Sequence, residues 1–129
     1  MNDGATVADA SAILALLKQE SFGRFDPRLL FRATISAVNL SEVLERLHSG
    51  GLSGSEAEAA VAELNLRVVD FDELQARLAA YLRTRTRRAG LSLGDRACLA
   101  LGVSLGCPVV TADRAWTRLD VGIEIVLIR

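Results

Sequence analysis

The chain has 129 residues, half of them hydrophobic, which suits one compact domain but hardly two. Its formal net charge of −1 argues against a protein that simply coats DNA or RNA, because such proteins often carry a basic surplus. No apolar run approaches the roughly 20 residues of a membrane span, and no N-terminal stretch has the layout of a signal peptide. Cys98 and Cys107 with the single His48 fit no usual zinc pattern, so we expect two small core cysteines and a cytoplasmic location.

Short strands alternate with helices along the sequence. The first half reads, in order, as a strand at residues 6–8, a helix at about 10–18, an irregular stretch at 20–32 with one helical turn after Pro27, a strand at 34–36, and helices at about 40–49 and 54–64. The second half continues with a strand at 67–69, a helix at 74–82, an arginine-rich run at 83–88, a buried helix at 93–105, and strands at 108–110 and 123–128. This alternation predicts one α/β domain over residues 1–129, with a central, mainly parallel five-stranded sheet between helices.

Four acidic residues are expected at one edge of this sheet. Asp9 directly follows the first strand, Asp113 follows the fourth, and Glu42 lies early in the helix after the second. Asp95 lies in the first turn of the helix that leads into the fourth strand, and that helix must start at the carboxyl edge of the sheet. Open parallel sheets bind their ligands beyond the carboxyl ends of the strands, so the four acids are candidates for one site.

Each acid also has a simpler interpretation. Asp9 and Asp113 could cap helices, and Asp95 and Glu42 each stand three residues after a polar residue, as in a capping box. Caps of unrelated helices need not point into one crevice, however, and carboxylates that do so repel one another. A divalent cation removes that repulsion, and Mg²⁺ or Mn²⁺ prefers oxygen ligands. The pattern therefore predicts a metal-dependent nuclease, in which a cation-activated water attacks phosphorus.

Four segments of the chain resemble the PIN-domain family, and within it the VapC-like toxins of bacterial toxin–antitoxin pairs. They are residues 7–12, 35–43, 91–101 and 110–116, which carry the four acids in order. The resemblance implies a three-layer α/β/α fold and a Mg²⁺-dependent endoribonuclease, with Mn²⁺ able to substitute. It implies that Asp9, Glu42, Asp95 and Asp113 are catalytic, metal-binding acids, with Asp113 expected to act through water, and that Ser11 supports the metal. It also implies a homodimer that is inhibited by a small antitoxin protein. The toxin would contact DNA only indirectly, through that antitoxin.

Several features leave alternatives open. Arg96 and Arg114 could hold RNA phosphates, be ordinary exposed arginines, or pair with the acids. The run from Arg83 to Arg88 could track an RNA backbone or simply suit the end of a helix. Trp116 is expected in the core or at a dimer interface rather than on a base, and His48 is expected to act as a partner for a helix end.

The chain departs from the VapC-like pattern in two places. Five residues precede the first strand, and the segment 19–32, which contributes to the antitoxin groove in relatives, does not follow the pattern.

Two other families with acids at strand ends do not fit the sequence. A response-regulator receiver needs a late lysine, and a haloacid-dehalogenase-type phosphatase needs an Asp-x-Asp pair; neither is present. A PIN nuclease that processes RNA outside toxin–antitoxin systems, or a catalytically silent PIN-like binding module, is the remaining alternative.

Overall fold

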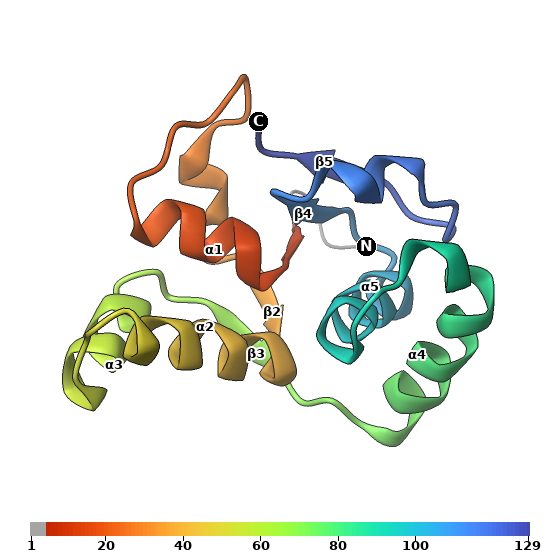
Figure 1. Ribbon diagram of the computed structural model, residues 1–129, viewed down its shortest axis with the longest axis horizontal. Helices are drawn as coiled ribbons and strands as arrows, with labels where there is room; N and C mark the ends of the chain where they lie inside the picture. The colour runs from red at the N-terminus through yellow and green to blue at the C-terminus, as the bar shows by residue number, and fades with distance from the viewer. Residues whose placement is uncertain (1–4) are drawn as a thin grey trace.

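The computed structural model describes residues 5–129, and its centre is one sheet of five parallel strands (Figure 1). The residues Met1 to Gly4, which precede the first strand, lie outside the described part. The spatial order is β3-β2-β1-β4-β5, and Val7 of β1 lies opposite Thr34 of β2 on one side and Val109 of β4 on the other. The strands are β1 Val7–Ala8, β2 Thr34–Ser36, β3 Arg67–Val69, β4 Val109–Thr111 and β5 Ile125–Leu127.

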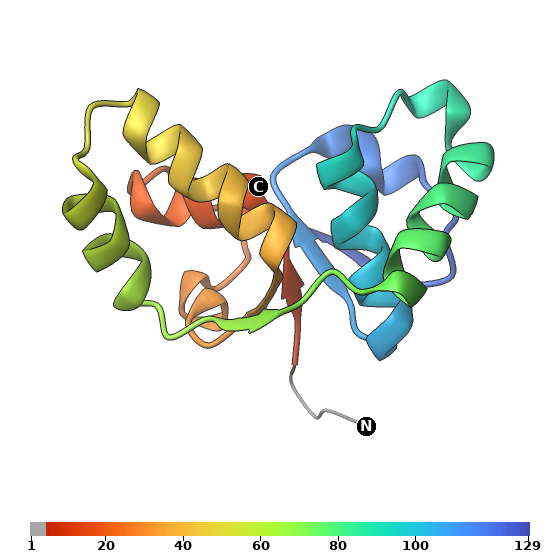
Figure 2. The ribbon, with the colours of Figure 1, turned by 90° about the horizontal axis from the view of Figure 1, so that it is seen from below.

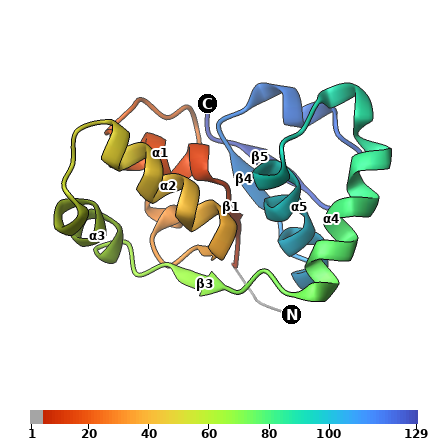
Figure 3. The same ribbon diagram turned by 60° about the horizontal axis from the view of Figure 1, so that its bottom comes forward.

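Helices cover both faces of this sheet. In Figures 2 and 3, α1, α2 and α3 lie on one side of the strands, and α4 and α5 lie on the other. The helices are α1 Ala10–Leu17, α2 Ala37–Ser49, α3 Gly54–Ala62, α4 Glu73–Arg85 and α5 Leu93–Leu105, with 3₁₀ turns η1 Pro27–Leu30, η2 Arg87–Ala89 and η3 Arg114–Arg118. The predicted three-layer α/β/α arrangement is confirmed. None of the helices in the described part is long and apolar enough to cross a membrane.

The sheet divides the core into two clusters because neighbouring residues of a strand point to opposite faces. Val7 and Val109 pack with α4 and α5, whereas Ala8 and Val110 pack with α1 and α2. Helix α5 packs against α4, α2 and the strands β1, β2 and β4. Its residues Ala97 to Leu101 are fully buried. That burial explains why its sequence is apolar nearly all round.

The ends of the elements follow from capping residues. Ser36, Ser53, Asp72 and Ser92 cap α2, α3, α4 and α5, and Gly106 ends α5 in a left-handed conformation. The bounds of α2, β4 and β5 differ from the prediction. Helix α2 begins at Ala37, directly after β2, because Ser36 rather than Asn39 is its cap. Strand β4 begins after Pro108, which has no N–H to donate, and β5 is limited to three residues.

The topology also marks one place on the carboxyl edge. From β1 the chain winds through β2 and β3 in one direction, whereas β4 and β5 lie on the opposite side of β1. A sheet that reverses its winding opens a crevice between the two strands at the reversal. Asp9 follows one of these strands and Asp113 lies two residues beyond the other.

Candidate active site at the carboxyl edge of the sheet

All four predicted acids line a single hollow of about 150 Å³ at this crevice. Asp9 comes from the end of β1, Glu42 from the second turn of α2, Asp95 from the first turn of α5, and Asp113 from the end of β4. The remaining lining residues include Ser11, Asn39 and Arg46. The structure therefore brings together side chains that are up to about one hundred residues apart in sequence.

Asp9 is the deepest of the acids, with only 5% of its surface exposed. The hydroxyl of Ser11 donates to both of its oxygens at 2.8 and 2.9 Å, and the Thr111 hydroxyl donates at 2.7 Å. The backbone N–H of Ala12 donates at 2.8 Å, so Asp9 also caps α1. These donors come from two elements on either side of the crevice and fix the orientation of the carboxylate.

Burial raises the pKa of Asp9 to about 6, despite hydrogen bonds from Thr111, Ala12 and Ser11 that lower it. The negative charge of Asp95 raises the pKa of Asp9 further. Beneath the hollow, burial raises the pKa of the Cys98 thiol well above its ordinary value, and the charges of Asp9, Asp95 and Glu42 add to that effect. The field in this region therefore favours the uptake of positive charge.

Glu42 is positioned by a bridge between α2 and α5. The side-chain amide of Asn39 donates to Glu42 Oε1 at 2.8 Å and to the carbonyl oxygen of Gly94 at 2.9 Å. Because both partners are acceptors, the amide nitrogen must face them. Asn39 Oδ1 is then buried without a partner among the described residues. A polar atom left in this way needs a donor, such as a water bound in the hollow.

Gly94 leaves room for the Glu42 carboxylate. A Cβ atom at this position would lie closer than 3.0 Å to the Glu42 carboxyl group. Glycine therefore leaves the space that the Glu42 side chain occupies. A side chain at residue 94 would displace the Glu42 carboxyl group rather than the backbone of α2.

Asp95 and Asp113 both accept hydrogen bonds at the start of a helix or 3₁₀ turn, and both also line the hollow. Asp95 Oδ2 accepts from the Ser92 N–H at 3.0 Å in a reciprocal capping box, and Asp113 Oδ1 accepts from the Ala115 N–H at 3.0 Å. Each uses one oxygen in this way, and its second oxygen has no hydrogen-bond donor within the described part of the chain. The two interpretations that the sequence left open are thus compatible.

The donor set fits a hydrated hard cation. Every acid offers oxygen, which Mg²⁺ and Mn²⁺ prefer. Across residues 5–129, however, no three His, Cys, Asp or Glu side chains lie close enough to share one ion directly. Mg²⁺ commonly keeps several of its waters and needs only one or two carboxylates. A hollow of about 150 Å³ has room for such an ion with several of its waters.

Other candidates lie elsewhere. Neither Arg96 nor Arg114 lines the hollow: Arg96 is half-buried and donates to the Ala79 carbonyl of α4 at 3.0 Å, and Arg114 is exposed. The geometry thus favours a structural role for Arg96, and phosphate binding by Arg114 stays a prediction. Trp116 is 1% exposed, which confirms a core position, and both cysteines are buried and free. His48 is exposed at the end of α2, with Nδ1 3.4 Å from the Leu52 carbonyl oxygen.

Sequence reasoning missed three residues of the site. Asn39 and Arg46 lie three residues before and four residues after Glu42, so helical spacing could have placed them on its face. Thr111, the last residue of β4, contacts Asp9 across the crevice. No local pattern marks Thr111, since only the pairing of β1 with β4 brings it there.

The family model of the PIN domain matches residues 6–122. The chain belongs to the PIN domain family. PIN domains are generally nucleases. No curated protein sequence matches the chain.

Several solved structures share the PIN fold at low sequence identity. VapBC2 of Rickettsia felis, bound to a DNA fragment of its promoter, is 15% identical, with 97% of this chain and 99% of that chain covered and a TM-score of 0.76. DNA-bound VapBC of Salmonella typhimurium is 22% identical, with coverages of 94% and 96% and a TM-score of 0.72. VapC20 of Mycobacterium tuberculosis, a toxin that cleaves the sarcin–ricin loop, is 19% identical, with coverages of 84% and 90% and a TM-score of 0.65.

Proposed function

We propose that this PIN domain is a Mg²⁺- or Mn²⁺-dependent endoribonuclease that hydrolyses phosphodiester bonds of RNA. The observation that carries the proposal is the convergence of Asp9, Glu42, Asp95 and Asp113 on one small hollow at the switch point of the sheet. Like charges gathered in this way destabilise a protein unless a cation compensates them. Family membership supplies the nuclease class, and the oxygen-only donor set supports the choice of cation.

The residues of the acidic hollow would have three roles: holding the cation, orienting the carboxylates and binding the phosphate. Asp9, Glu42, Asp95 and Asp113 would hold the Mg²⁺ or Mn²⁺, no more than two of them directly and the others through its waters, and the bound ion would supply an acidified water and positive charge for the phosphate. Ser11 and Thr111 keep the Asp9 carboxylate in one orientation, and Asn39 does the same for Glu42. Asp113 and Arg46 are exposed at the rim of the hollow, where a phosphate enters and where a guanidinium can bind it.

We also propose that the enzyme is the toxin of a toxin–antitoxin pair. The similar structures from Rickettsia felis and Salmonella typhimurium contain both members of such a pair together with DNA. By analogy, this chain would form a homodimer, bind a small antitoxin, and meet DNA only through that partner. The alternative, an RNA-processing PIN nuclease without an antitoxin, predicts that no small protein encoded beside it inhibits cleavage.

The test is to sequence the RNA ends that the purified protein produces from total cellular RNA. We expect discrete new ends with Mg²⁺ or Mn²⁺, no new ends with EDTA, and none with the Asp95→Asn variant. New ends made equally well in EDTA, or by Asp95→Asn, would contradict the proposal. If a small protein is encoded beside this chain and inhibits cleavage when it is added, the toxin is supported over an RNA-processing enzyme.

A further inference from the structure

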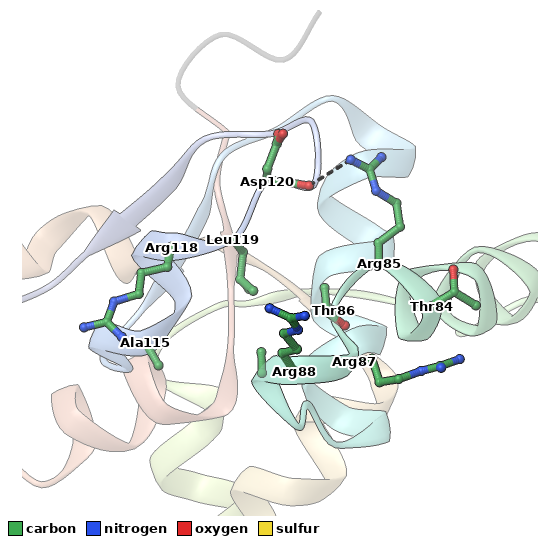
Figure 4. Close-up of a pocket in the computed structure, with 10 residues that line it drawn as sticks. Thr84, Arg85, Thr86, Arg87, Arg88, Ala115, Arg118, Leu119 and Asp120 are labelled. Carbon is green, nitrogen blue, oxygen red and sulfur yellow. Dashed lines mark hydrogen bonds between the residues drawn. The ribbon is translucent and has the colours of Figure 1, made fainter.

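A second and larger hollow lies beside the acidic one, and arginines dominate it. Its volume is about 890 Å³, within the range of roughly 300–1,000 Å³ that is typical of ligand pockets. The end of α4 and the turn η2 form one wall, and η3 with the residues after it forms the other (Figure 4). Its charged lining residues are Arg85, Arg87, Arg88, Arg118 and Asp120.

The four guanidinium groups are available for a ligand. Arg85 donates to the backbone carbonyl of Asp120 at 3.2 Å, and in the described part of the chain none of the four arginines takes part in an ion pair. Figure 4 shows Arg88 reaching into the space between Thr86 and Leu119, while Arg87 and Arg118 point outward from the two sides of that space, away from each other. The chain as a whole carries a net charge of −1, so this is a local concentration of positive charge. Exposed, unpaired guanidinium groups are well suited to phosphate oxygens.

The two hollows share a wall. Asp113 lines the acidic hollow and Ala115 lines the arginine hollow, and the Ala115 N–H donates to Asp113 Oδ1 at 3.0 Å. Residues two apart in sequence have Cα atoms no more than about 7 Å from each other. The two hollows therefore adjoin at η3, so that a strand bound at the acids can continue toward the arginine hollow.

The shape and lining favour a single-stranded nucleic acid. Arg87 and Thr86 also line a smaller hollow of about 200 Å³ together with Arg83, so the basic surface continues around η2. The apolar lining residues are Leu119, Ala115 and Ala89, and none of the lining residues is aromatic, so the contact with a nucleic acid here is mainly electrostatic. A positively charged groove that follows the backbone is a common part of single-strand binding sites.

We propose that this arginine hollow binds the phosphodiester backbone of single-stranded RNA next to the cleavage site. The proposal rests on the proposed nuclease function, because it assigns the hollow to the same substrate. An acidic segment of a protein partner would fit the arginines equally well by charge. The adjoining acidic hollow favours RNA, because it is the site at which the proposed nuclease acts on that substrate.

The experiment measures fluorescence anisotropy of a labelled, single-stranded 12-nucleotide RNA with the full-length protein in EDTA. The test variant is Arg88→Gln with Arg118→Gln, which removes two exposed charges of the hollow. The matched control is Arg28→Gln with Arg77→Gln, which removes two exposed charges elsewhere. We expect the test variant to bind at least about 10-fold more weakly at 100 mM salt, with a salt slope lower by about 1.4 for two lost contacts. The control should bind within about twofold of wild type.

Three outcomes would overturn the proposal. They are equal binding by the test variant and wild type, equal losses in the test and control variants, and binding of a 12-residue glutamate peptide as tight as that of the RNA. Cleavage of the same RNA with Mn²⁺ separates this proposal from the previous one. If arginine-dependent binding occurs without cleavage, the nuclease assignment fails; if cleavage occurs and the test variant binds normally, the arginine hollow fails.

Discussion

The two hollows on either side of η3 have opposite charge and opposite construction. In the acidic hollow, backbone N–H groups, hydroxyls or an amide hold the carboxylates, and Asp9 is almost fully buried. In the arginine hollow, the side chains are exposed and are mostly without partners in the described structure. The difference fits two tasks: chemistry at one phosphorus atom needs fixed groups, whereas capture of a flexible chain tolerates mobile ones.

The two hollows also differ in their effect on stability. With the pKa of Asp9 at about 6 against an ordinary value of 3.8, its ionised form costs the metal-free protein about 3 kcal/mol at neutral pH. The exposed arginines remain in contact with water, so their charges carry no comparable free-energy cost of burial. We therefore expect substitutions in the acidic hollow to change activity, stability and pH dependence, and substitutions in the arginine hollow to change RNA affinity alone.

The largest expected effect is that of removing an acid. Asp9→Asn or Asp95→Asn should lower Mn²⁺-dependent RNA cleavage by more than about 100-fold, because loss of a residue that merely supports a metal ligand already costs roughly 10–100-fold. Far-UV circular dichroism should show an intact fold. Cleavage at the wild-type rate by either variant would rule out the acidic hollow as the site of catalysis.

The pH dependence of stability should show the burial of Asp9 directly. Between pH 3.8 and about 6, folded Asp9 holds its proton while the unfolded chain has lost it, so the folded state binds more protons. Stability should therefore fall as pH rises through this range. Urea unfolding in EDTA should show that wild type loses about 3 kcal/mol more than Asp9→Asn between pH 4 and pH 7.5. Parallel curves for the two proteins would show that Asp9 has an ordinary pKa.

Gly94→Ala tests whether Glu42 needs the space beside α5. The added Cβ must displace the Glu42 carboxyl group, the end of a flexible side chain, so the fold should tolerate it. Cleavage should fall by about 10–100-fold with little change in Tm. Gly54→Ala is the matched control, since a Cβ there meets no atom within 4 Å. Equal activity of the two variants would remove Glu42 from the site.

Asn39→Ala removes the bridge to the same carboxylate from the α2 side. It leaves the buried Gly94 carbonyl without its donor, so unfolding should become easier by about 1–3 kcal/mol. Cleavage should fall by about 10-fold or more, measured well below the melting temperature. Ser41→Ala, at an exposed position of α2, should leave both quantities unchanged. If Asn39→Ala lowers only stability, the amide has no part in positioning Glu42.

The smallest effect is expected from Thr111→Val. The hydroxyl donates to Asp9 and lowers its pKa, so its loss should raise that pKa by about one unit. In urea unfolding in EDTA, the pH at which wild-type stability stops falling should move upward by the same amount, while Mn²⁺-dependent cleavage at pH 8.5 should stay within about 10-fold of wild type. An unchanged pH dependence of stability would mean that Thr111 does not lower the pKa of Asp9.

Most of the fold could be predicted from the sequence because its signals are local. Apolar spacing located the helices, and Ser53 and Ser92 marked the starts of α3 and α5. The boundary error at α2 arose because Ser36 is both the end of a strand and a cap, so the helix starts without a linker. The shortness of β5 depends on its pairing with β4 at the sheet edge, which no local pattern encodes.

The four acids that line the acidic hollow could also be predicted, but the hydrogen bonds that position them could not. The acids follow strand ends, and the topology of parallel sheets brings such residues together. The bridge from Asn39 to Gly94 and the bond from Thr111 to Asp9 join segments 55 and 102 residues apart, and they depend on helix packing. The sequence marked the run from Arg83 to Arg88 as one that could track an RNA backbone, but it did not reveal the hollow, because Arg118 meets this run only in the folded protein.

The central claim is that the four acids together bind a divalent cation, and calorimetric titration of Mn²⁺ into the protein at pH 7.5 tests it most directly. We expect wild type to bind Mn²⁺, and each of Asp9→Asn, Glu42→Gln, Asp95→Asn and Asp113→Asn to bind it at least about 10-fold more weakly. Glu63→Gln, an exposed acid at the end of α3, is the control and should bind like wild type. Absence of binding by wild type, or binding unaffected by all four substitutions, would contradict the account.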